Sequence, residues 1–322
     1  MLAAYAAAID PDKPLDGLVV GERPEPEVPQ GWARVKVKAV SLNHHDLWSL
    51  RGVGLPADRL PMILGCDAAG YDEDGNEVVV HAVIGDPDWK GDETVDPKRS
   101  LLSERYQGAL AEYVVVPRRN LVPKPPELSW EESACLPTAW LTAYRMLFTQ
   151  GAVTPGSTVL VQGAGGGVAT ALIALGAAAG VRVWATSRDE EKRAKALELG
   201  AAAVFDSGER LPERVDSVME TVGAATWAHS VRSLKPGGSI VISGATSGPN
   251  PKATELNRIF FLQLRVIGST MGTRDELHRL VEFLRVTGVR PVIDSVLPLS
   301  EARTGIERIQ SGDVVGKIVL TP

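Results

Sequence analysis

The stretch PGSTVLVQGAGGGVATALIALGAAAGVRVWATS, residues 155–187, decides the fold class of this chain. A run of aliphatic and β-branched residues precedes a glycine-rich turn, and an alanine-rich segment follows it. A second apolar run then ends at Ser187. This order predicts a strand, a tight turn, a helix and a second strand, which together form a βαβ unit with parallel strands.

The glycine-rich turn predicts a dinucleotide site. Glycines let the backbone approach a pyrophosphate, whose charge is stabilised by free N–H groups at the N-terminus of the following helix. Ala169 stands at the third glycine position of the fingerprint, where alanine is accepted. Such a run by itself can be a plain turn, and the surrounding strand–helix–strand pattern favours dinucleotide binding. The predicted phosphate contacts are Gly163, Gly165, Gly166, Gly167 and Val168.

The end of the second strand indicates which dinucleotide is bound. A cofactor without a 2′-phosphate is usually held by an acidic residue there. That position carries Ser187, with Arg188 next to it and Lys192 one turn further. We therefore expect NADP(H) rather than NAD(H), with Ser187, Arg188 and Lys192 as contacts. The alternative is that the two cations are solvated charges at the start of a helix.

The rest of the chain predicts two domains of an α/β protein. Residues 1–122 are rich in β-branched residues and turn formers, with strands expected in 32–42, 77–85 and 110–117 and a surface loop in 85–108. Helical and strand patterns alternate through 123–292, which is typical of a doubly wound parallel sheet. The final strand, within 316–322, is expected to return to the first domain.

Composition and charge exclude several function classes. The formal net charge is -6 and the chain has no basic block, so a nucleic-acid surface is not expected. No apolar run reaches the roughly 18 residues of a membrane span, and the N-terminus lacks a basic region of the secretory type. We expect a cytoplasmic protein without membrane or nucleic-acid partners. The two cysteines, Cys66 and Cys135, cannot build a disulfide framework or a four-cysteine zinc site.

Several runs, in this order, resemble the medium-chain dehydrogenase/reductase superfamily of zinc alcohol dehydrogenases and quinone oxidoreductases. They are PMILGCDAAG (61–70), GALAEYVVVP (108–117), LTAYRML (141–147), GAGGGVA (163–169) and GKIVL (316–320). The resemblance implies a GroES-like β domain from residues 1–122 and 293–322, a Rossmann domain from 123–292, and a small-molecule substrate. It also implies a dimer or tetramer, and we expect a homodimer.

Further cofactor contacts are implied by the resemblance. His44 stands where a basic residue often contacts the cofactor pyrophosphate, and a structural role for this ring is the alternative. The run 243–246 stands where backbone would lie against the nicotinamide. The remaining cofactor-binding candidates are Thr142, Gly244, Ala245 and Lys317.

The resemblance also bears on zinc. Zinc members of the superfamily hold their catalytic metal at three positions that carry Asn43, Cys66 and Thr138 in this chain, with Asp67 at the position of the family's Glu. Asn and Thr are poor zinc ligands, so we expect no metal ligands and no catalytic zinc. A rearranged set drawn from His44, His45, Cys66 and Asp67 stays open, although neighbouring histidines on an extended segment point to opposite faces.

The candidate catalytic residues are His45, Asn43 and Trp48. His45 stands where zinc alcohol dehydrogenases have the Ser/Thr of their proton relay, and an imidazole there can donate a proton near neutral pH. Asn43 could hydrogen-bond a substrate oxygen or the nicotinamide ribose, and Trp48 could line the pocket. Each of the three could instead be purely structural.

The leading hypothesis is an NADPH-dependent oxidoreductase that transfers hydride to an activated C=C bond (an enone) or a quinone without catalytic zinc. One alternative is an alcohol dehydrogenase or carbonyl reductase with a rearranged zinc site. Another is an NADP(H)-binding module without turnover.

Overall fold

A computed structural model describes all 322 residues, which form two compact units. Unit 1 comprises Met1–Leu141 and Met271–Pro322, and unit 2 comprises Thr142–Thr270. Helices α2 (Trp130–Ala134) and α8 (Arg274–Thr287), which the sequence assigned to the dinucleotide-binding domain, lie in unit 1. Helix α2 belongs to unit 1 because it packs against two strands of that unit's sheet, β3 (Trp32–Ser41) and β5 (Asp67–Tyr71).

Unit 1 is built around a seven-stranded sheet whose path is β10-β6-β5-β3-β18-β17, with β9 also paired to β3. The long β3 strand alternates buried and exposed residues and pairs antiparallel with β5, β9 and β18. The remaining strands of this unit are β1 (Leu2–Ala6), β2 (Leu18–Glu22), β4 (Met62–Ile63), β6 (Glu77–Val80), β7 (Val83–Ile84), β8 (Ser100–Leu101), β9 (Tyr113–Pro117), β10 (Leu121–Pro123), β17 (Ile293–Pro298) and β18 (Lys317–Thr321).

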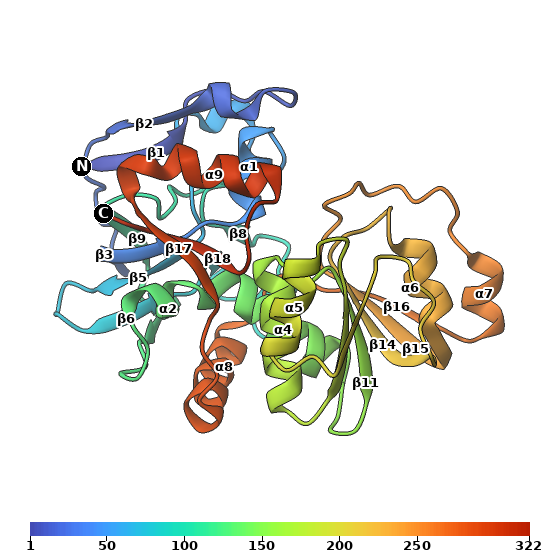
Figure 1. The fold of residues 1–322 in the computed structure, drawn as a ribbon. Coiled ribbons are helices and arrows are strands. Elements are labelled where there is room, and N and C mark those ends of the chain that lie inside the picture. Colours follow the sequence, from blue (N-terminus) through green and yellow to red (C-terminus); the bar gives the residue numbers. More distant parts are fainter. The chain divides into compact units, whose positions relative to one another are not determined.

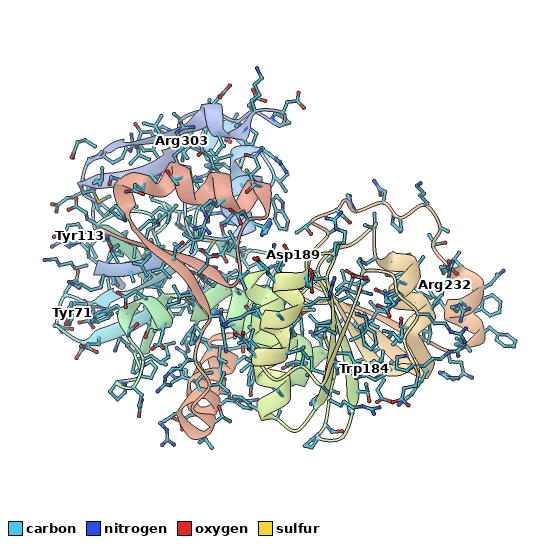
Figure 2. The ribbon with its side chains drawn as sticks, viewed as in Figure 1. Tyr71, Tyr113, Trp184, Asp189, Arg232 and Arg303 are labelled. Carbon is cyan, nitrogen blue, oxygen red and sulfur yellow. The ribbon has the colours of Figure 1, made fainter.

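Short helices complete unit 1. Arg303 of α9 donates hydrogen bonds to the carbonyl oxygens of Leu15 and Leu18, which ties this helix to the N-terminal strands (Figure 2). Helix α8 ends at Gly288, whose φ of 73° suits glycine. The other helices and turns are α1 (His44–Leu50), α9 (Ala302–Ser311), η1 (Pro14–Gly17), η2 (Ala57–Arg59), η3 (Glu93–Val95), η4 (Arg118–Asn120), η7 (Leu299–Glu301), the π-helical η5 (Leu136–Trp140) and, across the unit boundary, α3 (Leu141–Tyr144).

Two expectations for unit 1 need correction. The strand expected in 77–85 is divided into β6 and β7, because the backbone of His81 between them bonds to Asn120 instead of a neighbouring strand. The segment 85–108 is not a plain surface loop, since it contains η3 and β8 and buries Asp96 and Leu102. The expected return of the last strand is confirmed by the pairing of β18 with β3.

Unit 2 is a six-stranded parallel sheet in the order β13-β12-β11-β14-β15-β16. Helices α4 and α5 lie on one side of this sheet and α6 on the other (Figure 1), as in a doubly wound fold. The elements are β11 (Thr158–Gln162), α4 (Gly167–Ala178), β12 (Arg182–Thr186), α5 (Glu190–Glu198), β13 (Ala203–Phe205), β14 (Val215–Glu220), α6 (Trp227–Ser233), β15 (Leu234–Ile242), α7 (Leu256–Phe261), β16 (Arg265–Gly268) and the π-helical η6 (Arg145–Gln150).

The fold class expected from the sequence is confirmed, with one local difference. The helical pattern of residues 225–238 forms a helix only as far as Ser233, and Leu234 already belongs to β15. Pro236 is the cause, because the residue before a proline is driven out of the helical region. No helix of the structure has the length and apolar character needed to cross a membrane.

Candidate functional site

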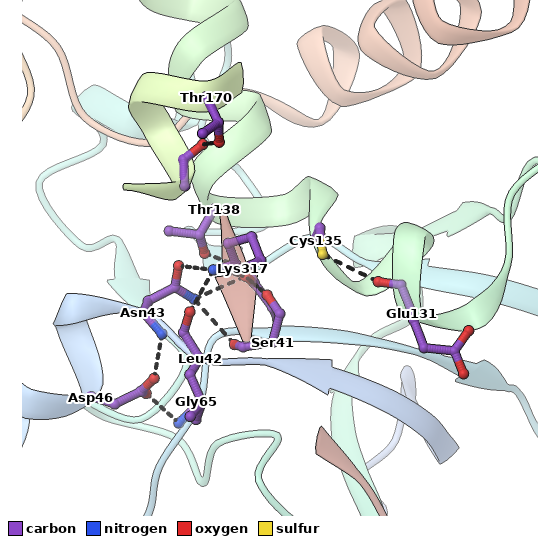
Figure 3. A network of polar contacts seen from close by, with 12 residues as sticks. Ser41, Leu42, Asn43, Asp46, Gly65, Glu131, Cys135, Thr138, Thr170 and Lys317 are labelled. Atoms are coloured by element: carbon purple, nitrogen blue, oxygen red, sulfur yellow. Dashed lines mark hydrogen bonds and ion pairs between the residues drawn. The ribbon is translucent and has the colours of Figure 1, made fainter. Parts of the chain in front are cut away.

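The carboxylate of Asp67 is the centre of a buried polar cluster in unit 1. Figure 3 labels Ser41, Asn43, Thr138 and Lys317 of this cluster. The Oδ2 of Asp67 accepts hydrogen bonds from Ser41 Oγ at 2.6 Å and Asn43 Nδ2 at 2.8 Å. Its Oδ1 accepts one from Thr138 Oγ1 at 2.5 Å. Thr138 lies in the π-helical turn η5, and such turns are frequent at functional sites. Two of the three zinc-ligand positions of the superfamily, Asn43 and Thr138, therefore donate to one carboxylate.

The ammonium of Lys317 lies in the same cluster and is only 3% exposed. Its Nζ donates to the carbonyl oxygen of Leu42 at 2.5 Å and to Asn43 Oδ1 at 2.6 Å, and lies 3.5 Å from Asp67 Oδ2. Buried charges are retained in proteins when they are paired and hydrogen-bonded, as here. The predicted cofactor contact of Lys317 remains a prediction, while these contacts are internal to unit 1.

Cys66, at the third zinc-ligand position, is directed away from the cluster. Its Sγ donates to the carbonyl oxygen of Leu102 at 3.2 Å and lies 3.9 Å from Ser103 Oγ. The side chain packs with Ala82, Val83 and other apolar residues. Burial, followed by the negative charges of Asp46 and Asp67, raises the pKa of the thiol well above its ordinary value. The hydrogen bond to Leu102 thus directs the sulfur away from Asn43 and Thr138.

The two histidines begin helix α1 and are not on an extended segment, which corrects the expectation about their orientation. Neighbouring residues of a helix point roughly 100° apart. The His44 ring lies 6.3 Å from the Trp48 ring, between centroids. Its outer side is exposed, and desolvation of the rest of the ring, followed by the charges of Lys317 and Arg51, lowers the pKa of His44. The Nε2 atom of His45 is buried and has no hydrogen-bond partner within the chain.

Asp46 is a buried carboxyl that the sequence reasoning did not single out. It accepts hydrogen bonds from the backbone N–H of Asn43 at 2.8 Å and of Gly65 at 2.9 Å, and so ties the start of α1 to the GCDAAG run. Burial raises the pKa of Asp46 to about 6, against the lowering effect of its bond from Asn43. The acid three residues after Asn43 could have indicated this contact, because residues in that position often cap a helix start.

The side chains at the superfamily's metal position do not fit zinc. Nowhere in the chain do three or more His, Cys, Asp or Glu side chains gather in a metal-binding arrangement, and the rearranged set of His44, His45, Cys66 and Asp67 is not such a group. The Asn43 amide, the Thr138 hydroxyl and the Cys66 thiol, which is directed toward Leu102, do not provide the three convergent ligands that zinc prefers.

In unit 2 the glycine-rich turn has the form that a pyrophosphate requires. Gly163 has a φ of 82°, which only glycine adopts readily. Gly166 precedes α4 with open space where a Cβ would stand, and no side chain caps the first N–H groups of this helix. Gly167 and Val168 form the first turn. A Cβ on Gly165 would collide with the stem of Lys192 at 2.5 Å, so this lysine lies over the turn.

The end of β12 is held by Arg193, a residue that the sequence reasoning did not single out. The Arg193 guanidinium donates to the carbonyl oxygen of Ser187 at 2.6 Å and pairs with Asp206. Ser187 Oγ accepts from the backbone N–H of Asp189, which caps α5. Arg188 is exposed and has no ion-pair partner in the structure.

The remaining predicted contacts of unit 2 lie on loops and at its boundary. Gly244 and Ala245 follow β15 and are half-buried. A Cβ on Gly244 would lie 3.1 Å from the carbonyl oxygen of Thr221, so the two loops are in close contact. Thr142 is 6% exposed. The predicted site residues are thus divided between the two units: His44, His45 and Lys317 are among those in unit 1, and Thr142 and the glycine-rich turn are among those in unit 2.

Two segments of the chain match known protein families. Residues 29–126 match the alcohol dehydrogenase GroES-like domain, and residues 167–285 match the family described as zinc-binding dehydrogenase. A zinc-type alcohol dehydrogenase-like protein of Schizosaccharomyces pombe is 31% identical, covering 92% of this chain and 93% of the relative. An acryloyl-coenzyme A reductase of Metallosphaera sedula is 28% identical, covering 95% and 96%. A crystal structure of an NAD-dependent alcohol dehydrogenase superimposes with a TM-score of 0.93 at 33% identity, covering both chains fully.

The chain therefore belongs to the medium-chain dehydrogenase/reductase superfamily. It is an NAD(P)H-dependent oxidoreductase. The hypothesis of a cofactor-binding module without turnover is not favoured by these relatives.

The Asp67–Lys317 pair yields a stability prediction. Lys317→Met leaves the Asp67 carboxylate buried without its cation, which should lower the free energy of unfolding by about 3–5 kcal/mol in a urea titration. The double variant Lys317→Met/Asp67→Asn should regain part of this loss, because the buried charge is gone. Lys235→Met, which breaks the half-exposed pair with Asp216, should cost less than about 1 kcal/mol. Equal losses for the two lysine variants would contradict the assignment.

Proposed function

We propose that this enzyme reduces an activated C=C bond or a quinone with NADPH and uses no catalytic zinc. The main support is the arrangement at the superfamily's three zinc-ligand positions: Asn43 and Thr138 donate to the buried Asp67, and the Cys66 thiol donates to Leu102. A carbonyl needs an electrophile to accept hydride at its own carbon, whereas a conjugated acceptor spreads the charge onto oxygen. The similarity to an acryloyl-coenzyme A reductase, whose name denotes a conjugated substrate, supports this class.

The residues of unit 1 would bind the substrate and supply a proton. When bound, NADPH would supply the hydride. His45 is the first candidate acid: its buried Nε2 has no partner within the chain, which leaves one hydrogen-bonding position for a substrate or a bridging water that reaches the ring. Asn43, fixed by its hydrogen bonds to Asp67 and Lys317, would form a polar side of the substrate site. The half-buried Trp48 would contact a flat substrate.

The test is NADPH oxidation by purified, untagged protein with a panel of enones, enoyl thioesters and quinones. We expect turnover of at least one class, with a rate that EDTA leaves unchanged. His45→Gln should lower kcat by roughly 100-fold, the usual effect of losing a general acid. His278→Gln, which changes an exposed histidine, is the matched control.

Metal content decides between this proposal and an alcohol dehydrogenase or carbonyl reductase. Near-stoichiometric zinc together with a chelator-sensitive rate on simple alcohols or aldehydes would replace the present proposal with that alternative.

We infer a preference for NADPH from the end of β12. Ser187 stands where an acid would favour NADH, the stem of Lys192 lies over the glycine-rich turn, and Arg188 is exposed without an ion pair. The exposed Arg188 guanidinium can pair with a 2′-phosphate through charge-assisted hydrogen bonds. The relative named as NAD-dependent makes a direct comparison of the two cofactors the decisive measurement.

Arg188→Ala should raise the KM for NADPH by roughly tenfold, because a charge-assisted hydrogen bond is lost, while the KM for NADH stays the same. Steady-state kinetics with each cofactor would measure this. Arg232→Ala is the control, since this exposed arginine lies on α6, away from Asp189 (Figure 2). Equal effects on both cofactors would count against a role in 2′-phosphate binding.

We also propose a homodimer formed through unit 2. Leu256, Phe260 and Phe261 of α7 are 65%, 69% and 79% exposed. The next strand, β16, is the edge strand of the sheet: it pairs with β15 on one side only, and its Val266 is 46% exposed. Exposed apolar clusters and free strand edges both favour association. A second copy can cover both by a twofold arrangement, in which the same surface meets itself.

Phe260→Ser/Phe261→Ser should convert the dimer to a monomer, as measured by light scattering coupled to size exclusion. Val286→Ser removes an equally exposed apolar side chain, 74% exposed, from α8 in unit 1 and should leave the dimer intact. A wild-type chain that is monomeric at micromolar concentration would refute the proposed interface.

A further inference from the structure

A buried carboxylate in unit 2 has no place in the chemistry described so far. Glu220, the last residue of β14, is fully buried. Its Oε1 accepts hydrogen bonds from the backbone N–H groups of Val222 at 2.8 Å and Gly223 at 3.0 Å. The Thr226 hydroxyl lies 2.9 Å from both carboxylate oxygens, and Ser230 Oγ donates to Oε2 at 2.6 Å. These donors are all neutral, so the carboxylate organises backbone and does not balance a cation through these bonds.

The first group held by Glu220 is a pair of loops. The amides of Val222 and Gly223 belong to the loop that follows β14. That loop bonds in turn to the loop after β15: Thr246 N–H donates to the carbonyl oxygen of Thr221, and Ser247 N–H to that of Val222. The position of the second loop, which includes Gly244 and Ala245, therefore depends on the position of the first.

The second group held by Glu220 is a chain of side chains that ends at the glycine-rich turn. Ser230 Oγ accepts from Gln162 Nε2 at 3.0 Å, and Gln162 Oε1 accepts from Thr186 Oγ1 at 2.7 Å. The N–H of Gly163 points to Thr186 Oγ1 at 3.4 Å. One network thus joins the carboxyl ends of β11, β12 and β14, which is the edge where open parallel sheets bind their ligands.

The proton directions along this network are fixed by a neutral histidine. Gln162 Nε2 also lies 2.9 Å from His229 Nδ1, and since an amide nitrogen only donates, Nδ1 accepts. His229 Nε2 then carries the hydrogen and donates to the carbonyl oxygen of Glu209 at 2.8 Å. Every donor in the chain from Gly163 to Glu220 therefore has an acceptor.

We propose that Glu220 is a positioning residue for the dinucleotide, fixing both the loops after β14 and β15 and the ends of β11 and β12. The inference rests on the proposed NADPH-dependent function. Glu220 itself does not contact the reacting atoms; it acts through Val222, Gly223 and Ser230.

Glu220→Gln tests this assignment, because it preserves volume but puts an amide donor where the Ser230 or Thr226 hydroxyl now donates. We expect the dissociation constants of NADPH and NADP⁺, measured by titration calorimetry without substrate, to rise roughly tenfold. At saturating NADPH, kcat should stay within about twofold, since only binding common to ground and transition states is lost. Glu213→Gln, at an exposed glutamate paired with Arg182, should leave the dissociation constants unchanged.

A second pair of variants distinguishes a loss of NADPH binding from a loss of folded protein. Thr226→Val removes the hydroxyl that lies against both carboxylate oxygens and should weaken NADPH binding, whereas Thr226→Ser should restore it. A role limited to folding would lower the melting temperature and the active fraction, and leave the dissociation constant of the folded molecules as in the wild type. Dissociation constants within about twofold of wild type for folded Glu220→Gln or Thr226→Val would overturn the proposal, since a lost hydrogen bond is expected to cost more.

The wild-type titration separates this proposal from the proposed function. Binding of NADH with exclusion of NADPH would refute the cofactor preference, and Glu220→Gln would then be expected to weaken NADH binding by the same factor. Binding of neither dinucleotide would refute both proposals.

Discussion

The carboxylate of Asp67 joins segments of unit 1 that are far apart in the sequence. It receives Ser41 from the end of β3, Asn43 from the start of α1 and Thr138 from η5, and it pairs with Lys317 at the start of β18. A buried charge is costly unless it is paired and hydrogen-bonded, so each segment must be in place for the carboxylate to be tolerated. The return of the last strand to β3 is therefore an electrostatic requirement as well as a matter of strand pairing.

This requirement shapes the chemistry available in unit 1. The lone pairs of Asp67 and the donors of Lys317 are already used within the protein, and Asn43 bonds to both. In the same unit, the buried Nε2 of His45 in α1 has no hydrogen-bond partner within the chain. A reaction that needs one proton at a defined place, and no strong Lewis acid, matches such a site better than one that must stabilise a full alkoxide.

The sequence predicted the architecture well and the polar networks poorly, for a physical reason. The βαβ pattern around Gly163 and the parallel sheet follow from local periodicity and turn residues, and both are confirmed. The return of β18 to the first domain is confirmed as well, but it is implied by the resemblance to the superfamily and not by a local pattern. The pairing of Asp67 with Lys317 joins residues 250 positions apart, and no local pattern encodes such a contact. The helical start at His44 was missed because Asn43 and Asp46 cap it through side chains, a contact that apolar periodicity does not report.

The buried carboxylates of Asp67 and Glu220 are compensated in different ways, and the difference explains what each can do. Asp67 is paired with an ammonium, so its surroundings form a closed, nearly neutral cluster that resists rearrangement. Glu220 has no cation partner among its hydrogen bonds: it accepts from the amides of Val222 and Gly223 in the loop after β14 and from the hydroxyl of Ser230 in α6. Partial charges from several such dipoles can stabilise an anion only if they converge on it. The loops that provide them are therefore ordered before any ligand arrives, which reduces the conformational entropy that binding must overcome.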